Sequence, residues 1–325
     1  ILTDRGSLVD VPTLRFVFGL AGFAIGVLGC VALAVVEFAA WALVAPPRTG
    51  RHDGDLDTVA REVVGLVQPI EVRAPDGARL VGRFLPAQGP IPTGRTVLLL
   101  HGFAETSSAL ERRRMAALSR HGWNVAALDS RGYGQSDGPY ATFGGRESSD
   151  VRAWLDRLGE FVSFSAPSVL FRPALWGRSM GAQIALRAAA EDARVAALVL
   201  ESPLVDLAAA VAVVIRKRRF PMSGLLARLI LRRASKLAGS PLDRPRPIDL
   251  APRVTCPALI LHGSDDTLVP IAAARRLAAA FPEPPAWVDV PGAGHSDVVD
   301  TGGEPLLDQV VVFLSKAAEV GAPVR

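Results

Sequence analysis

The chain has 325 residues, of which 50% are hydrophobic and 21% charged, and its formal net charge is +4. This length accommodates one large α/β domain and an appendage, and a mean hydropathy of +0.29 suggests that part of the chain lies in lipid. The small net charge, without a basic stripe interleaved with aromatic residues, argues against nucleic-acid binding. The two cysteines, Cys30 and Cys256, lie in different segments and we do not expect them to pair.

The first predicted element is an apolar segment without a charged residue, residues 16–36, which continues past Glu37 to Ala45. About 21 residues at 1.5 Å each match a hydrocarbon core of roughly 30 Å. We interpret residues 16–45 as a transmembrane anchor. A cleaved signal peptide is an alternative, since Ala40-Trp41-Ala42 fits a cleavage site, and a buried core helix is another. The flanking arginines do not decide the orientation.

Short apolar strands alternate with helices after a stretch rich in Pro, Gly and charge. A hairpin is expected over residues 68–85, around Pro75-Asp76-Gly77. Because the later strands are fully apolar and alternate with helices, we predict a mostly parallel sheet covered by helices on both faces. Strands are predicted at 96–100, 125–128, 174–176, 195–200, 258–261 and 286–290, and helices at 108–120, 148–158, 182–190, 271–280 and 306–318.

Gly177-Arg178-Ser179-Met180-Gly181 lies between a predicted buried strand and a helix. It has the Gly-x-Ser-x-Gly pattern of a nucleophile elbow in the strand–turn–helix context that such an elbow requires. The sharp turn strains the serine backbone, so the neighbouring residues must be small. The start of the helix offers free N–H groups where an oxyanion would develop. The pattern predicts that Ser179 is a nucleophile, and a structural turn serine is the alternative.

Three further polar turns follow predicted strands, and the carboxyl ends of parallel strands meet at one edge of a sheet. His101-Gly102-Phe103 offers a backbone N–H that would join the N–H of Met180 in an oxyanion hole. The run 262–270 supplies a carboxylate, and the run 292–297 supplies the imidazole of His295. This chain order of serine, acid and histidine differs from that of trypsin and subtilisin.

Together these motifs resemble the α/β-hydrolase superfamily, in its serine-aminopeptidase-like and lysophospholipase-like branch. The resemblance covers about residues 59–314. It implies the α/β-hydrolase fold with a helical cap inserted at about 203–250. It rests on His101-Gly102-Phe103, the run 129–138, the elbow, the His-Gly-x-x-Asp-x-x-Val-Pro run at 262–270 and the final Gly294-His295.

The resemblance implies a catalytic triad and an oxyanion hole. It assigns the triad to Ser179, Asp266 and His295, and the oxyanion hole to the backbone N–H groups of Phe103 and Met180. The spacing of the family motif selects Asp266, while Asp265 and Glu201 stay open as alternatives from the sequence. The remaining histidines at strand ends, His101 and His262, are structural in this interpretation.

The predicted organisation is an N-terminal flank (1–15), an anchor (16–45), a tether (46–58) and an α/β-hydrolase domain (59–325). We expect a membrane-anchored serine hydrolase that cleaves carboxylic ester or thioester bonds through an acyl-enzyme. The alternatives are an aminopeptidase-like amide hydrolase and a catalytically idle binding module. The expected substrate is a small acyl ester, with lipids as candidates, and the expected location is the bacterial plasma membrane, as a single-pass protein. We expect no metal and no dinucleotide cofactor, since neither zinc-ligand spacing nor a Gly-x-Gly-x-x-Gly run after the first strand is present.

The predicted cap combines apolar runs, 207–215 and 225–231, with the basic clusters 216–219 and 232–236. Basic residues beside apolar helical faces are typical of helices that lie among lipid headgroups. Two interpretations follow: a cap that closes over the site with solvated arginines, or a cap that also touches the membrane.

Overall fold

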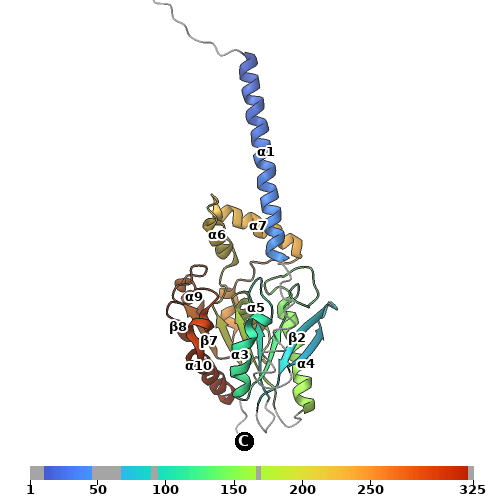
Figure 1. Cartoon of the computed structure of the whole chain (residues 1–325), viewed down its shortest axis with the longest axis vertical. Helices are drawn as coiled ribbons and strands as arrows, with labels where there is room; N and C mark the ends of the chain where they lie inside the picture. Colours follow the sequence, from blue (N-terminus) through green and yellow to red (C-terminus); the bar gives the residue numbers. More distant parts are fainter. Residues whose placement is uncertain (1–10, 46–66, 89–93, 166–169, 321–325) are drawn as a thin grey trace, which may run out of the picture.

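The structure, a computed structural model, describes residues 11–45, 67–88, 94–165 and 170–320 (Figure 1). A sheet lies between layers of helices, and one long helix, α1 (Val11–Val44), projects from one end of this domain. The predicted tether, 46–58, and the predicted start of the domain at residue 59 lie outside the described residues.

The sheet has eight strands in the order β1-β2-β4-β3-β5-β6-β7-β8. The predicted hairpin is present, because β1 and β2 pair antiparallel around the turn at Gly77, and β2 is also antiparallel to β4. All other neighbours are parallel, as the apolar strands predicted. The strands are β1 (Gln68–Arg73), β2 (Arg79–Leu85), β3 (Arg95–Leu100), β4 (Asn124–Leu128), β5 (Arg172–Arg178), β6 (Ala197–Glu201), β7 (Ala258–Gly263) and β8 (Ala286–Val290).

Helices cover both faces of the sheet, and alternate residues of each strand contact different helices. On β3, Leu98 and Leu100 join the apolar layer of α4, α5 and α9, whereas Val97 and Leu99 join that of α3 and α10. Burial on both faces explains why the central positions of β3 to β7 are apolar. These helices are α3 (Ser108–Arg120), α4 (Glu147–Ser165), α5 (Met180–Glu191), α9 (Ile271–Ala278) and α10 (Val298–Val320), the last interrupted at Gly303.

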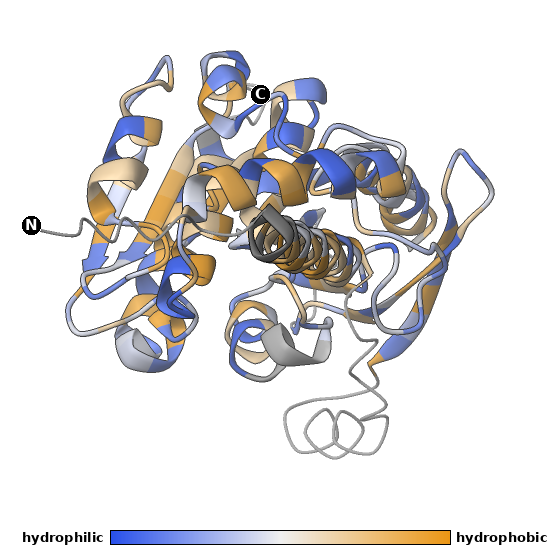
Figure 2. Cartoon of the chain, turned by 90° about the horizontal axis from the view of Figure 1, so that it is seen from above, coloured by the Kyte–Doolittle hydropathy of each residue, from blue (hydrophilic) through white to orange (hydrophobic). Residues whose placement is uncertain are grey.

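The cap is formed by the segment between β6 and β7. It contains α6 (Leu207–Lys217), α7 (Ser223–Ala238), the short α8 (Pro247–Leu250) and a 3₁₀ turn, η1 (Ala251–Arg253). α6 and α7 lie at the end of the domain from which α1 emerges (Figure 1). Figure 2 looks along α1 onto this end and shows that the helix rises over the domain rather than along its side.

α1 has a free part and a docked part. Residues 18–35 of this helix are exposed and include large apolar side chains such as Phe23 (72%) and Leu33 (72%), and the helix is long and apolar enough to cross a bilayer. Its last turns pack against α7, with Ala40 and Val44 fully buried in the core of the domain. Glu37 forms an ion pair with Arg233 of α7 at 2.5 Å. The end of α1 is therefore part of the folded domain.

Candidate active site

The serine of the elbow lies between β5 and α5, in a backbone conformation that few residues adopt. Ser179 has φ 53° and ψ −110°, a region that costs about 1–3 kcal/mol for a residue with a side chain. The two flanking glycines permit this turn. A Cβ on Gly177 would lie 2.1 Å from the carbonyl oxygen of Gly181, and a Cβ on Gly181 would lie 2.2 Å from that of Leu100. The elbow is thus held tightly against β3 and can contain only glycine at both positions.

Ser179, His295 and Asp266 form one chain of hydrogen bonds. Ser179 Oγ lies 2.8 Å from His295 Nε2, and His295 Nδ1 lies 2.7 Å from Asp266 Oδ2. The other carboxylate oxygen of Asp266 accepts the backbone N–H groups of Leu268 and Val269, both at 2.8 Å. The acid is therefore fixed by its own loop and oriented toward the imidazole. This arrangement can move a proton from the serine hydroxyl to the histidine.

The electrostatics of Asp266 favour its ionised form. Burial acts to raise the pKa of Asp266, but the hydrogen bonds from His295 and from the backbone of its loop outweigh burial and hold the pKa below its usual value. Asp266 is consequently a carboxylate at neutral pH and stabilises positive charge on the imidazole.

The other two acid candidates are held elsewhere. Asp265 is exposed and accepts a hydrogen bond from Ser264 Oγ. Glu201 is fully buried and forms a bidentate ion pair with Arg114, at 2.7 Å, while Trp176 Nε1 donates to it at 3.1 Å. The structure therefore brings Asp266, rather than either alternative, to His295.

The two histidines at other strand ends are buried and bonded to the backbone. The N–H of Ser130 donates to His101 Nε2, and His101 Nδ1 lies 2.8 Å from the carbonyl oxygen of Gly102. This pattern requires a neutral ring, and burial lowers the pKa of His101 accordingly. His262 Nε2 lies 2.9 Å from the carbonyl oxygen of Val269 and thereby supports the acid loop.

The predicted oxyanion-hole residues lie at the start of α5 and on the loop after β3. Met180 opens α5, and N–H groups in the first turn of a helix have no acceptor within that helix. Phe103 follows β3, and its ring stacks on that of Phe143, with centroids 5.9 Å apart. Gln183 of α5 donates to the carbonyl oxygen of Phe143 at 3.0 Å, so the helix that begins at the elbow also holds this aromatic pair.

A salt bridge that no pattern in the sequence predicted connects the loops of the site. Arg178 of the elbow pairs with Glu105, whose Oε2 accepts the N–H of Gly102 at 2.9 Å. Arg178 Nη1 also donates, at 3.0 Å, to the carbonyl oxygen of Ser296, beside the histidine. Burial acts to lower the pKa of Arg178, but the contacts with Glu105 outweigh it and raise the pKa. One ion pair therefore ties together the elbow, the predicted oxyanion loop and the histidine loop.

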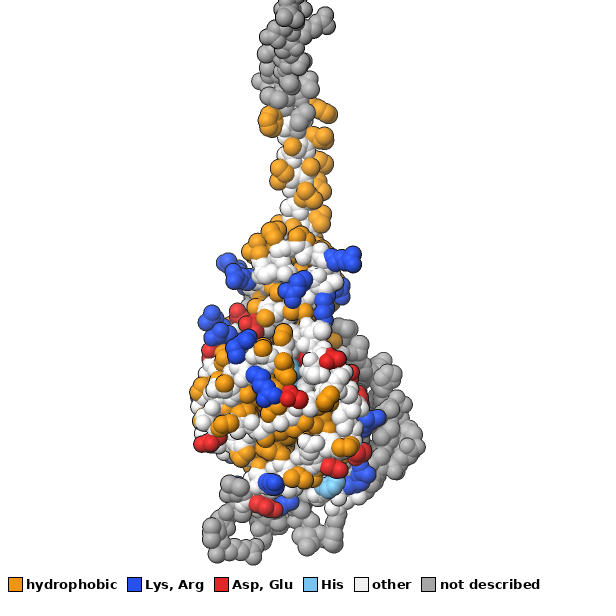
Figure 3. Space-filling view, turned by 90° about the vertical axis from the view of Figure 1, so that its left-hand side faces the viewer, with side chains coloured by type: hydrophobic (Ala, Val, Ile, Leu, Met, Phe, Trp, Pro, Cys, Tyr) orange, Lys and Arg blue, Asp and Glu red, His pale blue; other side chains and the backbone are white. Residues whose placement is uncertain are grey.

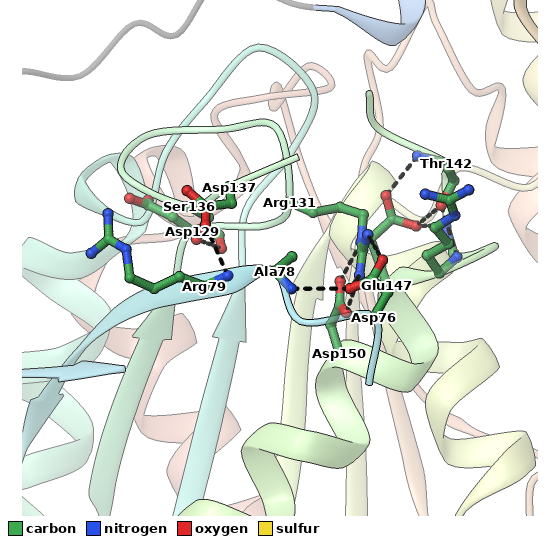
Figure 4. Close-up of polar contacts among 12 residues, drawn as sticks. Asp76, Ala78, Arg79, Asp129, Arg131, Ser136, Asp137, Thr142, Glu147 and Asp150 are labelled. Carbon is green, nitrogen blue, oxygen red and sulfur yellow. Dashed lines mark hydrogen bonds and ion pairs between the residues drawn. The ribbon is translucent and has the colours of Figure 1, made fainter. Parts of the chain in front are cut away.

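The run 129–138 forms a dense polar network with the first hairpin and with α4 (Figure 4). Asp129 accepts the N–H of Ser107, and Ser136 Oγ donates to the carbonyl oxygen of Asp129 at 2.7 Å. Arg131 is buried and pairs with Asp150 of α4 and with Asp76 of the hairpin turn. These contacts fix the loop after β4 against the first hairpin, so the run serves to position its neighbours.

The next loop is held by a carboxylate of α4. Glu147 accepts the backbone N–H groups of Thr142 and Gly144, at 2.6 and 2.9 Å (Figure 4 shows the contact with Thr142). Phe143, between them, stacks on Phe103, so Glu147 supports the loop that lines the site. The N–H of Ala141 in the same loop donates to the carbonyl oxygen of Val44, which links this loop to the end of α1.

Comparison with known proteins identifies the family of the chain. The sequence profile described as Serine aminopeptidase, S33 matches residues 92–247. Protein Rv2307c of Mycobacterium tuberculosis is 33% identical over 264 residues, which are 81% of this chain and 84% of that protein. The chain belongs to the α/β-hydrolase superfamily. Polyketide transferase grgF of a Penicillium species is 31% identical over 140 residues, 42% of this chain and 45% of that protein.

The α/β-hydrolase fold is also found in solved structures. The Pyrococcus furiosus esterase Pf2001 superposes with a TM-score of 0.66 at 22% identity, and the match covers 84% of this chain and 98% of that one. The predicted fold class is therefore confirmed, including its mostly parallel sheet and the apolar helix before it.

Proposed function

We propose that this protein is a membrane-anchored serine hydrolase that cleaves carboxylic ester or thioester bonds through an acyl-enzyme. The observation that carries the proposal is the continuous chain of hydrogen bonds from Ser179 through His295 to Asp266, with 2.8 and 2.7 Å between the bonded atoms. The strained serine backbone at the start of α5 presents the hydroxyl at the cap end of the sheet.

In the first half-reaction, Ser179 Oγ attacks the acyl carbonyl carbon while its proton moves to His295 Nε2. Asp266, ionised at neutral pH, stabilises the imidazolium that forms. The carbonyl oxygen becomes an oxyanion held by the backbone N–H groups of Phe103 and Met180. The bond to the leaving group then breaks, and the leaving oxygen or sulfur takes the proton from His295.

In the second half-reaction, a water molecule takes the place of the leaving group. His295 removes a proton from this water, and the resulting hydroxide attacks the acyl carbon of the serine ester. The same N–H groups hold the second oxyanion. When it collapses, the carboxylic acid leaves and His295 returns the proton to Ser179, which restores the resting site.

The surroundings of the triad favour an ester over the amino-terminal residue of a peptide. An aminopeptidase needs a free carboxylate to bind the ammonium group of its substrate. Three carboxylates near the triad are paired: Asp266 with His295, Glu105 with Arg178 and Glu201 with Arg114. Amide hydrolysis is therefore the second choice, although the matching family description names an aminopeptidase.

The packing of α1 supports an anchor over a cleaved signal peptide. Cleavage after Ala42 would cut within the turns that dock on the domain and would release Ala40, which is fully buried. The ion pair between Glu37 and Arg233 would also be lost. A removable peptide gains nothing from such contacts, whereas a permanent anchor gains a rigid connection to its domain.

An acyl acceptor other than water is a further possibility that the relatives raise. The Penicillium relative is a polyketide transferase by name, and transfer differs from hydrolysis only in the nucleophile of the second half-reaction. Product analysis distinguishes the two outcomes.

The test is an activity profile of the full chain in detergent, over p-nitrophenyl esters of increasing acyl length, a thioester and an amino-acyl arylamide. The proposal predicts turnover of esters with release of the free acid, little turnover of the arylamide, and loss of both half-reactions in Ser179→Ala. Arylamide turnover faster than ester turnover would favour the peptidase. No turnover of any substrate, with no acyl-enzyme by mass spectrometry, would favour an idle binding module.

A further inference from the structure

The outer surface of α6 and α7 combines exposed apolar and basic side chains. Residues 207–240 contain eight Lys and Arg and no Asp or Glu. Apolar side chains are exposed in the same segment: Phe220 (50%), Met222 (69%), Leu225 (52%) and Leu229 (43%). We call these four residues, together with Arg216, Arg218, Arg219, Arg228, Arg232 and Lys236, the cap patch.

The cap patch is one side of an amphipathic helix pair. On α7, Leu225, Leu229, Arg232 and Lys236 follow a helical stripe that is exposed throughout. The opposite side of α7 is buried through Ala227, Ile230, Leu231 and Ala234. The exposed leucines are therefore not needed for packing within the described residues. Apolar residues flanked by Lys and Arg are the composition of a helix that lies in a membrane interface.

The anchor places this patch at the level of the lipid headgroups. The charged residues that bound the uncharged stretch of α1 are Arg15 and Glu37. They are 22 positions apart, which in a helix spans about 33 Å and matches a hydrocarbon core of about 30 Å. The near surface of the bilayer then falls at Glu37, and Glu37 is paired with Arg233 of α7. α7 consequently lies where the headgroups begin.

The arrangement of the elements agrees with this level. In Figure 1 the turn between α6 and α7 projects from the domain in the same direction as α1. Figure 3 shows Lys and Arg side chains around the part of the domain nearest to α1, with apolar side chains between them. Positive charge at this height would meet the phosphates of an anionic leaflet.

We infer that the cap patch binds the surface of an anionic bilayer, with Phe220, Met222, Leu225 and Leu229 inserted among the lipids and the surrounding arginines on the phosphates. The inference rests on the part of the proposed function that makes α1 a permanent anchor. It extends that function because the cap lies at the same end of the sheet as Ser179. Acyl esters carried in the bilayer would then reach the site from the inserted face.

The size of the effect follows from the charges. Each Lys or Arg held near an anionic surface strengthens binding by about fivefold. Replacing Arg216, Arg218 and Arg219 by Ser should therefore shift the balance between the inserted and the withdrawn cap by roughly a hundredfold. Lys217 is left in place because its Nζ lies 2.6 Å from Thr267 Oγ1, next to the acid of the site.

The experiment measures the depth of the cap in vesicles that contain the full chain. Cys30 is replaced by Ala, and a single cysteine labelled with the fluorophore NBD replaces Leu225. The control label replaces Val312, which is equally exposed (52%) but lies on α10. Burial raises the pKa of the Cys256 thiol to about 11, so this thiol should not react at neutral pH, and the unlabelled parent checks this. Vesicles consist of phosphatidylcholine with or without phosphatidylglycerol, and contain lipids that quench NBD near the headgroups.

In anionic vesicles we expect the NBD emission of the Leu225 label to be blue-shifted and quenched, and in neutral vesicles we expect smaller effects. The label at Val312 should show the emission of NBD in water in both kinds of vesicle. The triple variant of Arg216, Arg218 and Arg219 should bring the Leu225 label back to water. A control variant with the same change of charge, in which Arg120, Arg157 and Lys316 become Ser, should leave it quenched. All three control residues are exposed and lie outside the cap.

Two results would overturn the inference: a Leu225 label that resembles the Val312 label in anionic vesicles, or equal quenching with and without phosphatidylglycerol. Hydrolysis of a soluble short ester by the triple variant should equal that of the unmodified chain, whereas hydrolysis of an ester embedded in anionic vesicles should fall. Because the quenching does not depend on turnover, an inactive protein would refute the proposed function and leave the inference standing.

Discussion

The ion pair between Glu105 and Arg178 offers a direct test of how the site is held together. The carboxylate of Glu105 accepts the N–H of Gly102, next to the proposed oxyanion donor Phe103. The guanidinium of Arg178 pairs with Glu105 and donates to the carbonyl oxygen of Ser296. Glu105→Ala removes the acceptor for Gly102 and leaves Arg178 without its carboxylate. Glu105→Gln keeps an acceptor oxygen but removes the charge.

The expected magnitude follows from what the pair controls. Loss of one oxyanion donor costs about 10²–10³ in kcat. Here the donor is displaced rather than removed, so we expect about a hundredfold loss in Glu105→Ala and about tenfold in Glu105→Gln. KM should change little, because the contact acts on the transition state more than on bound substrate. Breaking a buried pair costs roughly 3–5 kcal/mol of stability; since the Glu105 side chain is 21% exposed, we expect about 2 kcal/mol.

The assay is steady-state hydrolysis of a soluble ester together with chemical unfolding. Glu191→Gln is the matched control, because Glu191 is 23% exposed, pairs with Arg187 and lies at the end of α5 opposite to the elbow. The control should lose a little stability and no kcat. If Glu105→Ala lost stability but kept its kcat, or if KM rose while kcat held, the pair would be a structural contact and the argument for a positioning role would be wrong.

Three other outcomes are expected. Gly181→Ala should destabilise the domain by about 3 kcal/mol or more, because its Cβ would lie 2.2 Å from the carbonyl oxygen of Leu100 and the backbone cannot easily move away. Unfolding of this variant at the denaturant concentration of the unmodified chain would refute the tight packing of the elbow. Deleting residues 1–35 should preserve the unfolding free energy, whereas deleting residues 1–45 should lower it by about 3 kcal/mol, because the burial of Ala40 and Val44 is lost. Equal unfolding free energies of the two shortened chains would show that the end of α1 does not stabilise the domain. Asp266→Asn should lower kcat by about 10⁴. Burial opposes ionisation of Asp266, but its hydrogen bonds hold its pKa below the usual value. The ionised group therefore stabilises the fold above about pH 4, and this contribution is lost as the pH falls further. If the difference in unfolding free energy between the unmodified chain and Asp266→Asn stayed constant from neutral pH to about pH 3, this pH dependence would be wrong.

Local signals were sufficient to predict most of the fold. The apolar strands predicted a parallel sheet because a strand buried on both faces has no polar position, and the sheet order confirms it. The turn at Gly77 has a positive φ, which glycine favours. The glycines of the elbow are required for a different reason, since a Cβ on Gly177 or Gly181 would lie 2.1 or 2.2 Å from a backbone oxygen. Helix α10 is longer than predicted, because a short helical segment precedes the expected helix and is separated from it only by the non-helical residue Gly303.

Contacts between distant segments were not predictable in this way. No spacing in the sequence predicts that Glu105 pairs with Arg178. From the sequence, the choice among Asp265, Asp266 and Glu201 depends on the family resemblance, whereas in the structure Asp266 is the one bonded to His295. These pairs depend on how loops meet in space, which local patterns do not encode.

The docking of α1 is a further example of a distant contact. Hydropathy does not distinguish the exposed turns of α1 from the turns that pack on α7, because both parts are apolar. Glu37 was the available signal: a lone carboxylate near the end of an apolar helix requires a partner, and Arg233 of the cap provides it. The sequence did not indicate which arginine this would be.

The most direct test of the central claim is covalent labelling of the full chain by a fluorophosphonate, followed by mass spectrometry of the labelled peptide. The reagent reacts with a serine only where a neighbouring base removes its proton and an oxyanion site holds the product. We expect one label per chain, on Ser179, with no labelling of Ser179→Ala and strongly reduced labelling of His295→Ala. Absence of labelling in the unmodified chain, or a label that persists at another serine in Ser179→Ala, would contradict it.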